Sequence, residues 1–255
     1  MPNWKEFANH WEVRDYFRPF FNEVRSGTLN LGRPYYVLSL AYGVMQAIHC
    51  GYDEITAIEF GVGRGAGLLD LCKAAQFFTD ELGLKIFVLG FDNATGLPTP
   101  VDYRDHPEIW KRGDFRLQSA EQLSLDLPPF ARLVVGDIRE TIADLPKLIS
   151  APLGFASVDV DYYSSATACL KGFSFDPSLY VPAVPVYFDE VDTLFTLSDR
   201  GGERLAITEF NEQHRLRSIE RKPECRIRQF YACHVLDHPV RTGTQPRMPL
   251  YIMPL

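Results

Sequence analysis

Two pairs of acidic residues follow two apolar stretches, and their spacing suggests chemistry. The stretch GFASVDVDYYSSA carries Asp159 and Asp161, and VPVYFDEV ends in Asp189 and Glu190. A buried, unpaired carboxylate costs on the order of several kcal/mol, so these groups need water, hydrogen-bond donors or a cation. Neither stretch contains Cys or His, which favours Mg²⁺ over zinc as that cation. The alternative is that each carboxylate caps a following helix or faces water.

A glycine-rich segment, AIEFGVGRGAG, predicts a second site. Gly61, Gly63 and Gly65 allow a tight turn and a close approach of the backbone to a ligand. The segment fits the dinucleotide fingerprint, but Glu59 stands where a carboxylate could hold an amino group, and Asp92 lies beyond the usual spacing of about 20 residues. Both details favour S-adenosylmethionine, a nucleoside with an amino acid tail. The alternative is a turn needed only for helix–strand packing.

Two aspartates could complete this cofactor site. Asp92 ends KIFVLGFD, where a carboxylate could accept both ribose hydroxyls or cap the next turn. Asp137, in LVVGDIRE, could face the adenine amino group or serve as the N-cap of the helix that follows.

Alternating elements must position these residues. Apolar runs rich in β-branched and aromatic residues predict strands at 55–60, 85–91, 131–135, 154–160 and 183–188. Helical spacing predicts helices at 33–51, 66–82, 139–149, 164–173 and 202–216. Late strands are expected within 226–236 and 249–255, and residues 215–222 are interpreted as a solvated helix end. This alternation predicts an α/β fold, with a doubly wound, mostly parallel sheet and helices on both faces. Ligands bind beyond the carboxyl ends of such strands.

These motifs together resemble the class I S-adenosylmethionine-dependent methyltransferases, in particular the metal-dependent sugar O-methyltransferases of the macrocin O-methyltransferase type. The matching segments are EFGVGRG, GFDNATGLP, DVDYYSSA and YFDEV, in that order, over roughly residues 55–212. The resemblance implies a Rossmann-like, seven-stranded sheet and methylation of a hydroxyl on a small molecule. The chain departs from the family at Glu190, where Asp is usual, at Ala166, where Thr is usual, and at Val191, where some members carry His.

The resemblance also assigns roles to the residues. It implies that Asp159, Asp189 and Glu190 bind Mg²⁺ and that Asp161 is the general base. It implies that the S-adenosylmethionine site is lined by Glu59, Gly61, Gly63, Gly65, Asp92 and Asp137.

The composition of the chain indicates which classes of partner to expect. The chain has 255 residues, 46% of them hydrophobic and 23% charged, with a formal net charge of −7 and no basic run that would read nucleic acid. Scattered cysteines, no signal-like N-terminus and no long apolar run predict a cytoplasmic protein with no membrane partner. A homodimer is the commonest assembly of such proteins.

The expected organisation is a helical extension or cap at 1–53 and one Rossmann-like domain at 54–255. The long connection 93–130 is expected to be either a lid or a packed surface excursion. Two competing functions stay open. One is an NAD(P)-dependent oxidoreductase that uses GVGRGA, although no evident Tyr-x-x-x-Lys pair accompanies it. The other is a non-catalytic module that binds S-adenosylmethionine.

Overall fold

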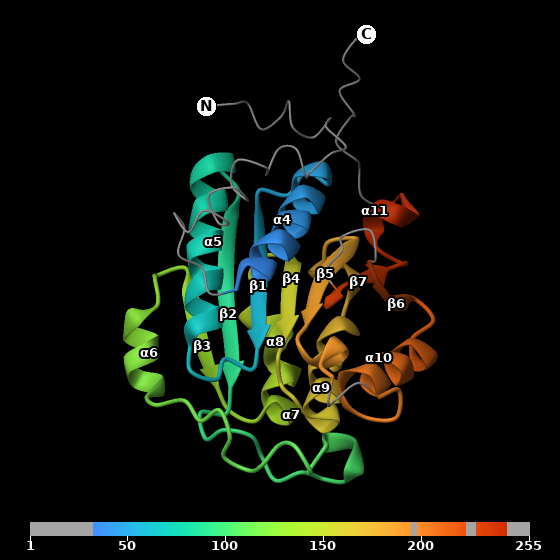
Figure 1. The fold of residues 1–255 in the computed structure, drawn as a ribbon. Helices are drawn as coiled ribbons and strands as arrows, with labels where there is room; N and C mark the ends of the chain where they lie inside the picture. The colour runs from blue at the N-terminus through green and yellow to red at the C-terminus, as the bar shows by residue number, and fades with distance from the viewer. Residues whose placement is uncertain (1–32, 195–197, 223–227, 244–255) are drawn as a thin grey trace, which may run out of the picture.

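A computed structural model of the chain describes residues 33–194, 198–222 and 228–243. These residues form one sheet of seven strands in the order β3-β2-β1-β4-β5-β7-β6 (Figure 1). The strands β1 to β5 pair in parallel, whereas β7 pairs antiparallel with both β5 and β6. Their bounds are β1 Glu54–Phe60, β2 Lys85–Asp92, β3 Ala131–Val135, β4 Leu153–Val158, β5 Ala183–Phe188, β6 Arg217–Arg221 and β7 Phe230–Val235. The predicted doubly wound, mostly parallel fold is confirmed.

Helices cover both faces of the sheet. The β1-α5-β2 crossover steps toward one edge and the β4-α9-β5 crossover toward the other, so right-handed connections place α5 and α9 on opposite faces. The helix α4 packs beside α5, and α10 packs against α9. The α-helices are α4 Pro34–His49, α5 Ala66–Leu82, α6 Ala120–Asp126, α7 Ile138–Thr141, α8 Leu145–Leu148, α9 Tyr163–Leu170, α10 Gly202–Gln213 and α11 Pro239–Thr242. Short 3₁₀ turns occupy Tyr103–Asp105, Ile142–Asp144, Lys171–Phe173, Pro177–Leu179 and Glu190–Asp192.

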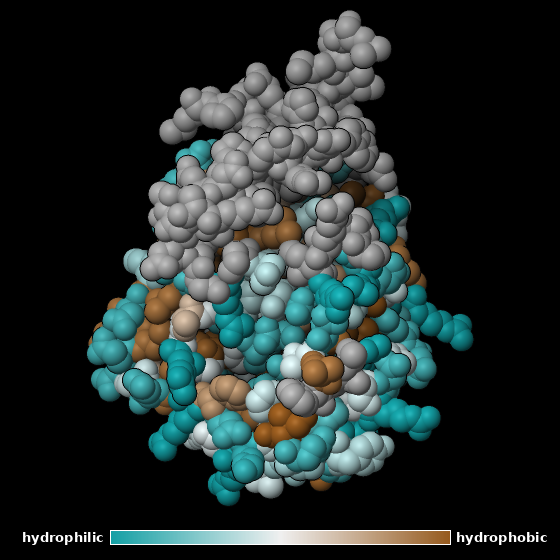
Figure 2. Space-filling model, viewed as in Figure 1, coloured by the Kyte–Doolittle hydropathy of each residue, from teal (hydrophilic) through white to brown (hydrophobic). Residues whose placement is uncertain are grey.

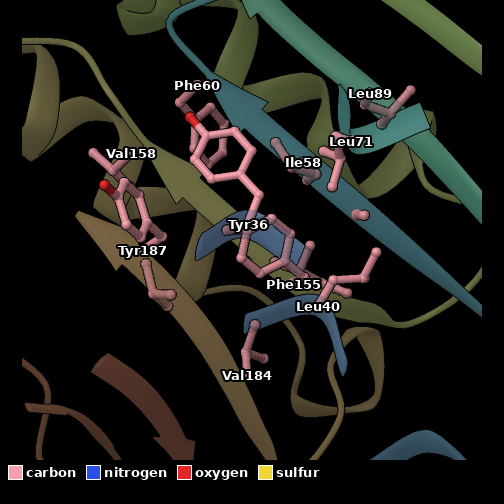
Figure 3. Close-up of a cluster of buried hydrophobic side chains, with 14 of the residues drawn as sticks. Tyr36, Leu40, Ile58, Phe60, Leu71, Leu89, Phe155, Val158, Val184 and Tyr187 are labelled. Atoms are coloured by element: carbon pink, nitrogen blue, oxygen red, sulfur yellow. The ribbon is translucent and has the colours of Figure 1, made fainter. Parts of the chain in front are cut away.

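The helix α4 belongs to the same hydrophobic core as the sheet. It begins with Pro34, a residue suited to the first helical turn, and it ends before Gly51, whose φ is positive. Tyr36 and Leu40 are buried among side chains of β1, β4 and β5 (Figure 3). The ring centroids of Tyr36 and Tyr187 lie 5.2 Å apart. The described part of residues 1–53 therefore packs on the sheet, and the division of the chain at residue 53 stays a prediction.

Most of the predicted elements are confirmed, but two interpretations were wrong. Residues 215–222, interpreted as a solvated helix end, contain the strand β6, in which Arg217 and Ile219 are buried and Glu220 and Arg221 are exposed. Antiparallel pairing with β7 makes this segment a strand despite its charged residues. The strand predicted at 154–160 ends at Val158. The strand predicted within 226–236 is β7, and the one at 249–255 lies outside the described residues.

The long connection 93–130 is ordered against the rest of the molecule. Reciprocal backbone bonds tie its two sides together, from Leu97 N to Asp114 O and from Gly113 N to Leu97 O, each 2.8 Å long. The fully buried carboxylate of Asp105 accepts hydrogen bonds from the backbone and side chain of Ser164 at the start of α9. In Figure 1 this segment lies below the carboxyl ends of the parallel strands.

Three further observations concern the described residues. No helix among the described residues is long and apolar enough to cross a membrane. The four cysteines within the described ranges, Cys50, Cys72, Cys169 and Cys233, are all buried. The described surface in the space-filling view is mostly hydrophilic, with separate hydrophobic groups (Figure 2).

Candidate active site

The strand register brings the predicted site residues together. Phe60 at the end of β1 pairs with Phe91 of β2 and with Val158 of β4, and Val158 pairs with Phe188 of β5. These four strands therefore end at one level. The residues that follow these four positions are Gly61, Asp92, Asp159 and Asp189, so they collect at one edge of the sheet.

A cavity of about 480 Å³ opens at this edge. Its walls come from the glycine turn, from the ends of β2 to β5 and from the connection 93–130, which contributes Leu97, Trp110, Asp114 and Phe115. The volume lies within the range of about 300–1,000 Å³ typical of small-molecule sites. Of the sequence-predicted residues, the lining includes Gly61, Gly63, Asp92, Asp137, Asp159, Asp161, Asp189 and Glu190.

Asp92 holds the glycine turn in place. Its Oδ2 accepts hydrogen bonds from the backbone N–H groups of Val62, at 3.0 Å, and Gly63, at 2.9 Å. Its Oδ1 accepts a third bond from Ala94 N at 2.6 Å. The sequence predicted a ribose-binding or turn-capping carboxylate, and the structure shows the capping bonds on a side chain that also lines the cavity. Gly61, with φ of +83°, lies so close to the next strand that a Cβ would stand 1.8 Å from the carbonyl oxygen of Asp159.

Asp137 lines the cavity, but its carboxylate is engaged locally. Its Oδ1 accepts the backbone N–H of Arg139, which makes Asp137 the N-cap of α7. The Arg139 guanidinium forms an ion pair with both carboxylate oxygens, and its hydrogen bonds lower the pKa of Asp137. The capping alternative is therefore the one that the contacts support, and a contact with adenine stays a prediction.

Two predicted cofactor residues lie outside the cavity lining. Gly65 is the left-handed N-cap of α5, and its α-carbon faces the side chain of Leu123. Glu59 is buried behind the turn, where a Cβ on Gly67 would meet its Oε1 at 2.1 Å. Strand alternation explains this position, because Glu59 points to the helix-covered face on which α4 and α5 lie.

Glu59 belongs to a buried polar chain. Its Oε1 accepts a hydrogen bond of 3.0 Å from the Tyr36 hydroxyl, and its Oε2 has no partner among the described residues. Burial raises the pKa of Glu59 well above its ordinary value, and the charge of Asp159 raises it further. Burial therefore favours the protonated form of Glu59 more than it would favour that of an exposed glutamate.

Asp159 and Asp161 both reach the cavity although β4 ends before them. The backbone leaves the extended conformation after Val158, and Asp161 is left-handed with φ of +59°. Burial and then the charges of Asp159, Glu190 and Asp189 raise the pKa of Asp161 to about 8. The pKa of Asp159 rises to about 7, through burial and Asp189, even though Arg33 lowers it.

The second acidic pair is fixed by different contacts. Asp189 Oδ1 accepts a hydrogen bond of 3.0 Å from the Tyr187 hydroxyl. The backbone N–H of Glu190 donates to Glu203 Oε2 at 2.9 Å, which ties the end of β5 to α10. Glu203 is fully buried, so its pKa is raised well above the ordinary value. Sequence reasoning missed Glu203, whose position in the first turn of α10 resembles that of an ordinary helix-start carboxylate.

Sequence reasoning also missed Arg33, the cation at this end of the cavity. Its Nη1 lies 2.5 Å from Asp159 Oδ2 and 3.7 Å from Asp189 Oδ1. The sequence contains no signal for this contact, because Arg33 and Asp159 are 126 positions apart. An arginine before Pro34 reads only as a helix start.

The arrangement does not fit the predicted Mg²⁺ site. The guanidinium of Arg33 stands beside the two carboxylates that were expected to ligate the metal. Mg²⁺ needs oxygen ligands at about 2.0–2.1 Å in octahedral geometry. Within the described ranges, no three Asp, Glu, His or Cys side chains gather closely enough to hold a metal ion.

Aromatic residues from the connection 93–130 complete the wall. Trp110 and Phe115 pack edge to face with centroids 5.6 Å apart, and both line the cavity. His106 is buried beside Glu108 and is not part of the described lining.

Comparison with solved structures agrees with this architecture. A crystal structure of CalS11, calicheamicin methyltransferase, is 21% identical, and the match covers 89% of this chain and 92% of that chain with a TM-score of 0.58. The fold is that of the class I S-adenosylmethionine-dependent methyltransferases. The apo structure of CalS11, named as a TDP-rhamnose 3'-O-methyltransferase of calicheamicin biosynthesis, is 20% identical over 89% of this chain and 94% of that chain, with a TM-score of 0.50. The sequence matches no protein-family model and no curated protein.

Proposed function

We propose that the protein transfers a methyl group from S-adenosylmethionine to a hydroxyl group of a small-molecule acceptor. One observation carries the proposal. One cavity joins the glycine turn to a group of buried and half-buried carboxylates, at the carboxyl edge of a methyltransferase-type sheet. The likeness to CalS11 supports an oxygen acceptor, since that enzyme is named as an O-methyltransferase of a nucleotide-linked sugar.

The glycine turn fits the cofactor. A Cβ on Gly63 would meet nothing closer than 3.8 Å, so the cavity is open where the backbone of the turn approaches a ligand. The first turn of α5, which begins at Ala66, offers backbone N–H groups to the same space. When bound, the cofactor would supply an electrophilic methyl group. Asp92 would hold its ribose while keeping the turn fixed.

Asp161 would act as the general base. A pKa of about 8 gives this carboxylate a higher affinity for protons than an ordinary aspartate, and its ionised form, which accepts the hydroxyl proton, becomes the major form as pH rises through about 8. The acceptor hydroxyl would lie between Asp161 and the methyl group, aligned for in-line attack. Trp110 and Phe115 would shield this region from water.

The sheet topology disfavours the oxidoreductase alternative. The dinucleotide-binding fold has the strand order 3-2-1-4-5-6. Here an antiparallel β7 is inserted between β5 and β6. The sheet therefore departs from the dinucleotide-binding order at the edge that follows the acidic strand ends.

Calorimetric titration with S-adenosylmethionine tests the cofactor assignment. The variant Gly63→Ala places a methyl group in the cofactor end of the cavity, and it should weaken binding by about tenfold or more. Gly83→Ala is the matched control, because Gly83 also has a positive φ but ends α5 away from the cavity. Equal affinities for the two variants would remove the turn from the cofactor site. A change in NADH fluorescence on mixing, without S-adenosylmethionine binding, would favour the oxidoreductase.

Release of S-adenosylhomocysteine from a panel of hydroxylated acceptors tests the reaction. Nucleotide-linked sugars come first because of the substrate in the name of CalS11. Asp161→Asn should lower turnover by about 10²–10⁴-fold with unchanged cofactor affinity. Asparagine tolerates the left-handed backbone at this position, so the variant isolates the proton acceptor. Cofactor binding with no turnover on any acceptor would favour the non-catalytic module.

A further inference from the structure

Building on the proposed methyl transfer, we propose that the guanidinium of Arg33 is the resident cation of the acidic end of the cavity, so that the reaction needs no divalent metal ion. In this role Arg33 would neutralise Asp159 and Asp189 and donate hydrogen bonds to the acceptor oxygen.

Hydrogen bonds hold Arg33 in position through both its backbone and its side chain. Its backbone N–H donates to Asp70 Oδ2 at 3.1 Å, which fixes the start of α4 to α5. Its Nη1 donates to the Tyr36 hydroxyl at 3.1 Å and to Asp159 Oδ2 at 2.5 Å. The side chain is 38% exposed and lies at the cavity wall, so part of the guanidinium faces the ligand space.

The partners of Arg33 are themselves held rigidly. Tyr36 is 1% exposed and donates its own hydroxyl proton to Glu59, so that its oxygen is turned toward the guanidinium. Asp189 is fixed by Tyr187, whose ring packs against that of Tyr36. A polar chain therefore runs from the buried acid Glu59 through Tyr36 to Arg33 and its carboxylates.

Charge balance agrees with this assignment. Burial lowers the pKa of Arg33, but the negative charges of Asp159 and Asp189 outweigh this effect, and the pKa lies above its ordinary value. The group is therefore permanently charged. A divalent cation bound to Asp159 at about 2 Å would stand against this fixed positive charge, and the two would repel each other.

The assignment changes how an acceptor oxygen is handled. The planar guanidinium keeps donors beyond those used by Tyr36 and Asp159, and these can stabilise negative charge that develops on the oxygen. Asp161 then removes the proton, and the methyl carbon forms its bond to the oxygen as the bond to sulfur breaks. No co-reactant besides the methyl donor is needed.

Binding of Mn²⁺, followed by electron paramagnetic resonance, tests the assignment without the acceptor. The full-length wild type should show no saturable Mn²⁺ site. Arg33→Ala should gain one saturable Mn²⁺ site, because loss of the guanidinium removes its positive charge and leaves Asp159 and Asp189 open to the metal. Arg33→Lys, which keeps the charge, should behave as the wild type and also guards against misfolding of the alanine variant.

Arg139→Ala is the matched control, since it removes an arginine from a single carboxylate, Asp137, at the cavity wall. It should gain no Mn²⁺ site. A stoichiometric Mn²⁺ site in the wild type, or no gain in a folded Arg33→Ala variant, would overturn the assignment.

A second measurement separates this inference from the proposed function. Turnover and S-adenosylmethionine binding are measured in EDTA and then with added Mg²⁺. Unchanged turnover in EDTA supports Arg33 as the cation. Turnover that stops in EDTA and returns with Mg²⁺ would overturn the inference and leave the methyltransferase intact. Absence of cofactor binding, with the expected Mn²⁺ results, would overturn the methyltransferase and leave Arg33 as the resident cation.

Discussion

Replacement of Gly61 by alanine tests how tightly the glycine turn is set against the acidic strand end. The Cβ would stand 1.8 Å from the carbonyl oxygen of Asp159, whereas real Cβ contacts essentially never fall below 3.0 Å. The two strands must therefore separate by more than an ångström. A backbone bond between these two strands opposes that separation, from Asp159 N to Phe60 O, 2.9 Å long.

The expected loss of stability has two parts. A left-handed backbone costs an alanine about 1–2 kcal/mol. Overpacking against a backbone that cannot easily move adds about 1–3 kcal/mol. Gly61→Ala should therefore lower the free energy of unfolding by about 2–5 kcal/mol.

Gly113→Ala provides the matched control. Gly113 has nearly the same φ, +87° against +83°, but a Cβ at this position would meet nothing within 4 Å. Gly113→Ala should therefore lower the free energy of unfolding by only about 1–2 kcal/mol. Urea unfolding followed by circular dichroism gives the free energy of unfolding of both variants, provided that this free energy falls with urea concentration at the same slope in each. Equal losses for the two variants would refute the claim that close backbone contact, rather than conformation alone, requires glycine at position 61.

Three further predictions concern buried polar groups. The pKa of Glu59 is higher in the folded state than its unfolded value of about 4.5, so its protonated form stabilises the fold at low pH and this contribution is lost as pH rises. In Glu59→Gln the free energy of urea unfolding should therefore depend less on pH above about 5. The same pH dependence in the variant and the wild type would contradict this. Tyr36→Phe removes the hydroxyl that donates to Glu59, and it should lower the free energy of urea unfolding by about 1–3 kcal/mol. Tyr103→Phe, at a side chain that is 72% exposed, should lower it by no more than about 0.5 kcal/mol. Asp105→Asn weakens the bonds that dock the connection 93–130 onto α9, so limited proteolysis should cut that connection faster than in Asp80→Asn, which changes an exposed carboxylate; equal cutting rates would argue against the docking role.

Much of the fold could be predicted because most of the parallel strands, β1, β2, β4 and β5, are largely buried on both faces. Such strands read as short apolar runs between helices, and β1, β2, β3 and β5 lie within two residues of their predicted bounds. β6 was missed because edge strands carry charge, and Arg217 and Glu220 resemble a helix end in the sequence. Only pairing with β7 shows the strand.

The candidate site was predicted where residues follow strands directly. The parallel register of the strands is enough to place three of these residues at the same edge of the sheet, namely Asp92, Asp159 and Asp189. Glu59 lies outside the cavity lining because one step of strand alternation turns its carboxylate toward α4, and its contact with the cofactor stays a prediction. Arg33 could not be predicted, since its contact depends on how α4 packs across β4 and β5.

The two edges of the sheet limit how two copies of the chain could associate. Among the described strands, β6 and β3 are the outermost, and each exposes charge: Glu220 and Arg221 on β6, and Arg132 on β3. Charged edges disfavour the addition of a further strand from another molecule. Extension of the sheet from copy to copy is thereby discouraged. If the predicted homodimer forms, we expect helical surfaces, rather than strand pairing, to meet at its two-fold axis.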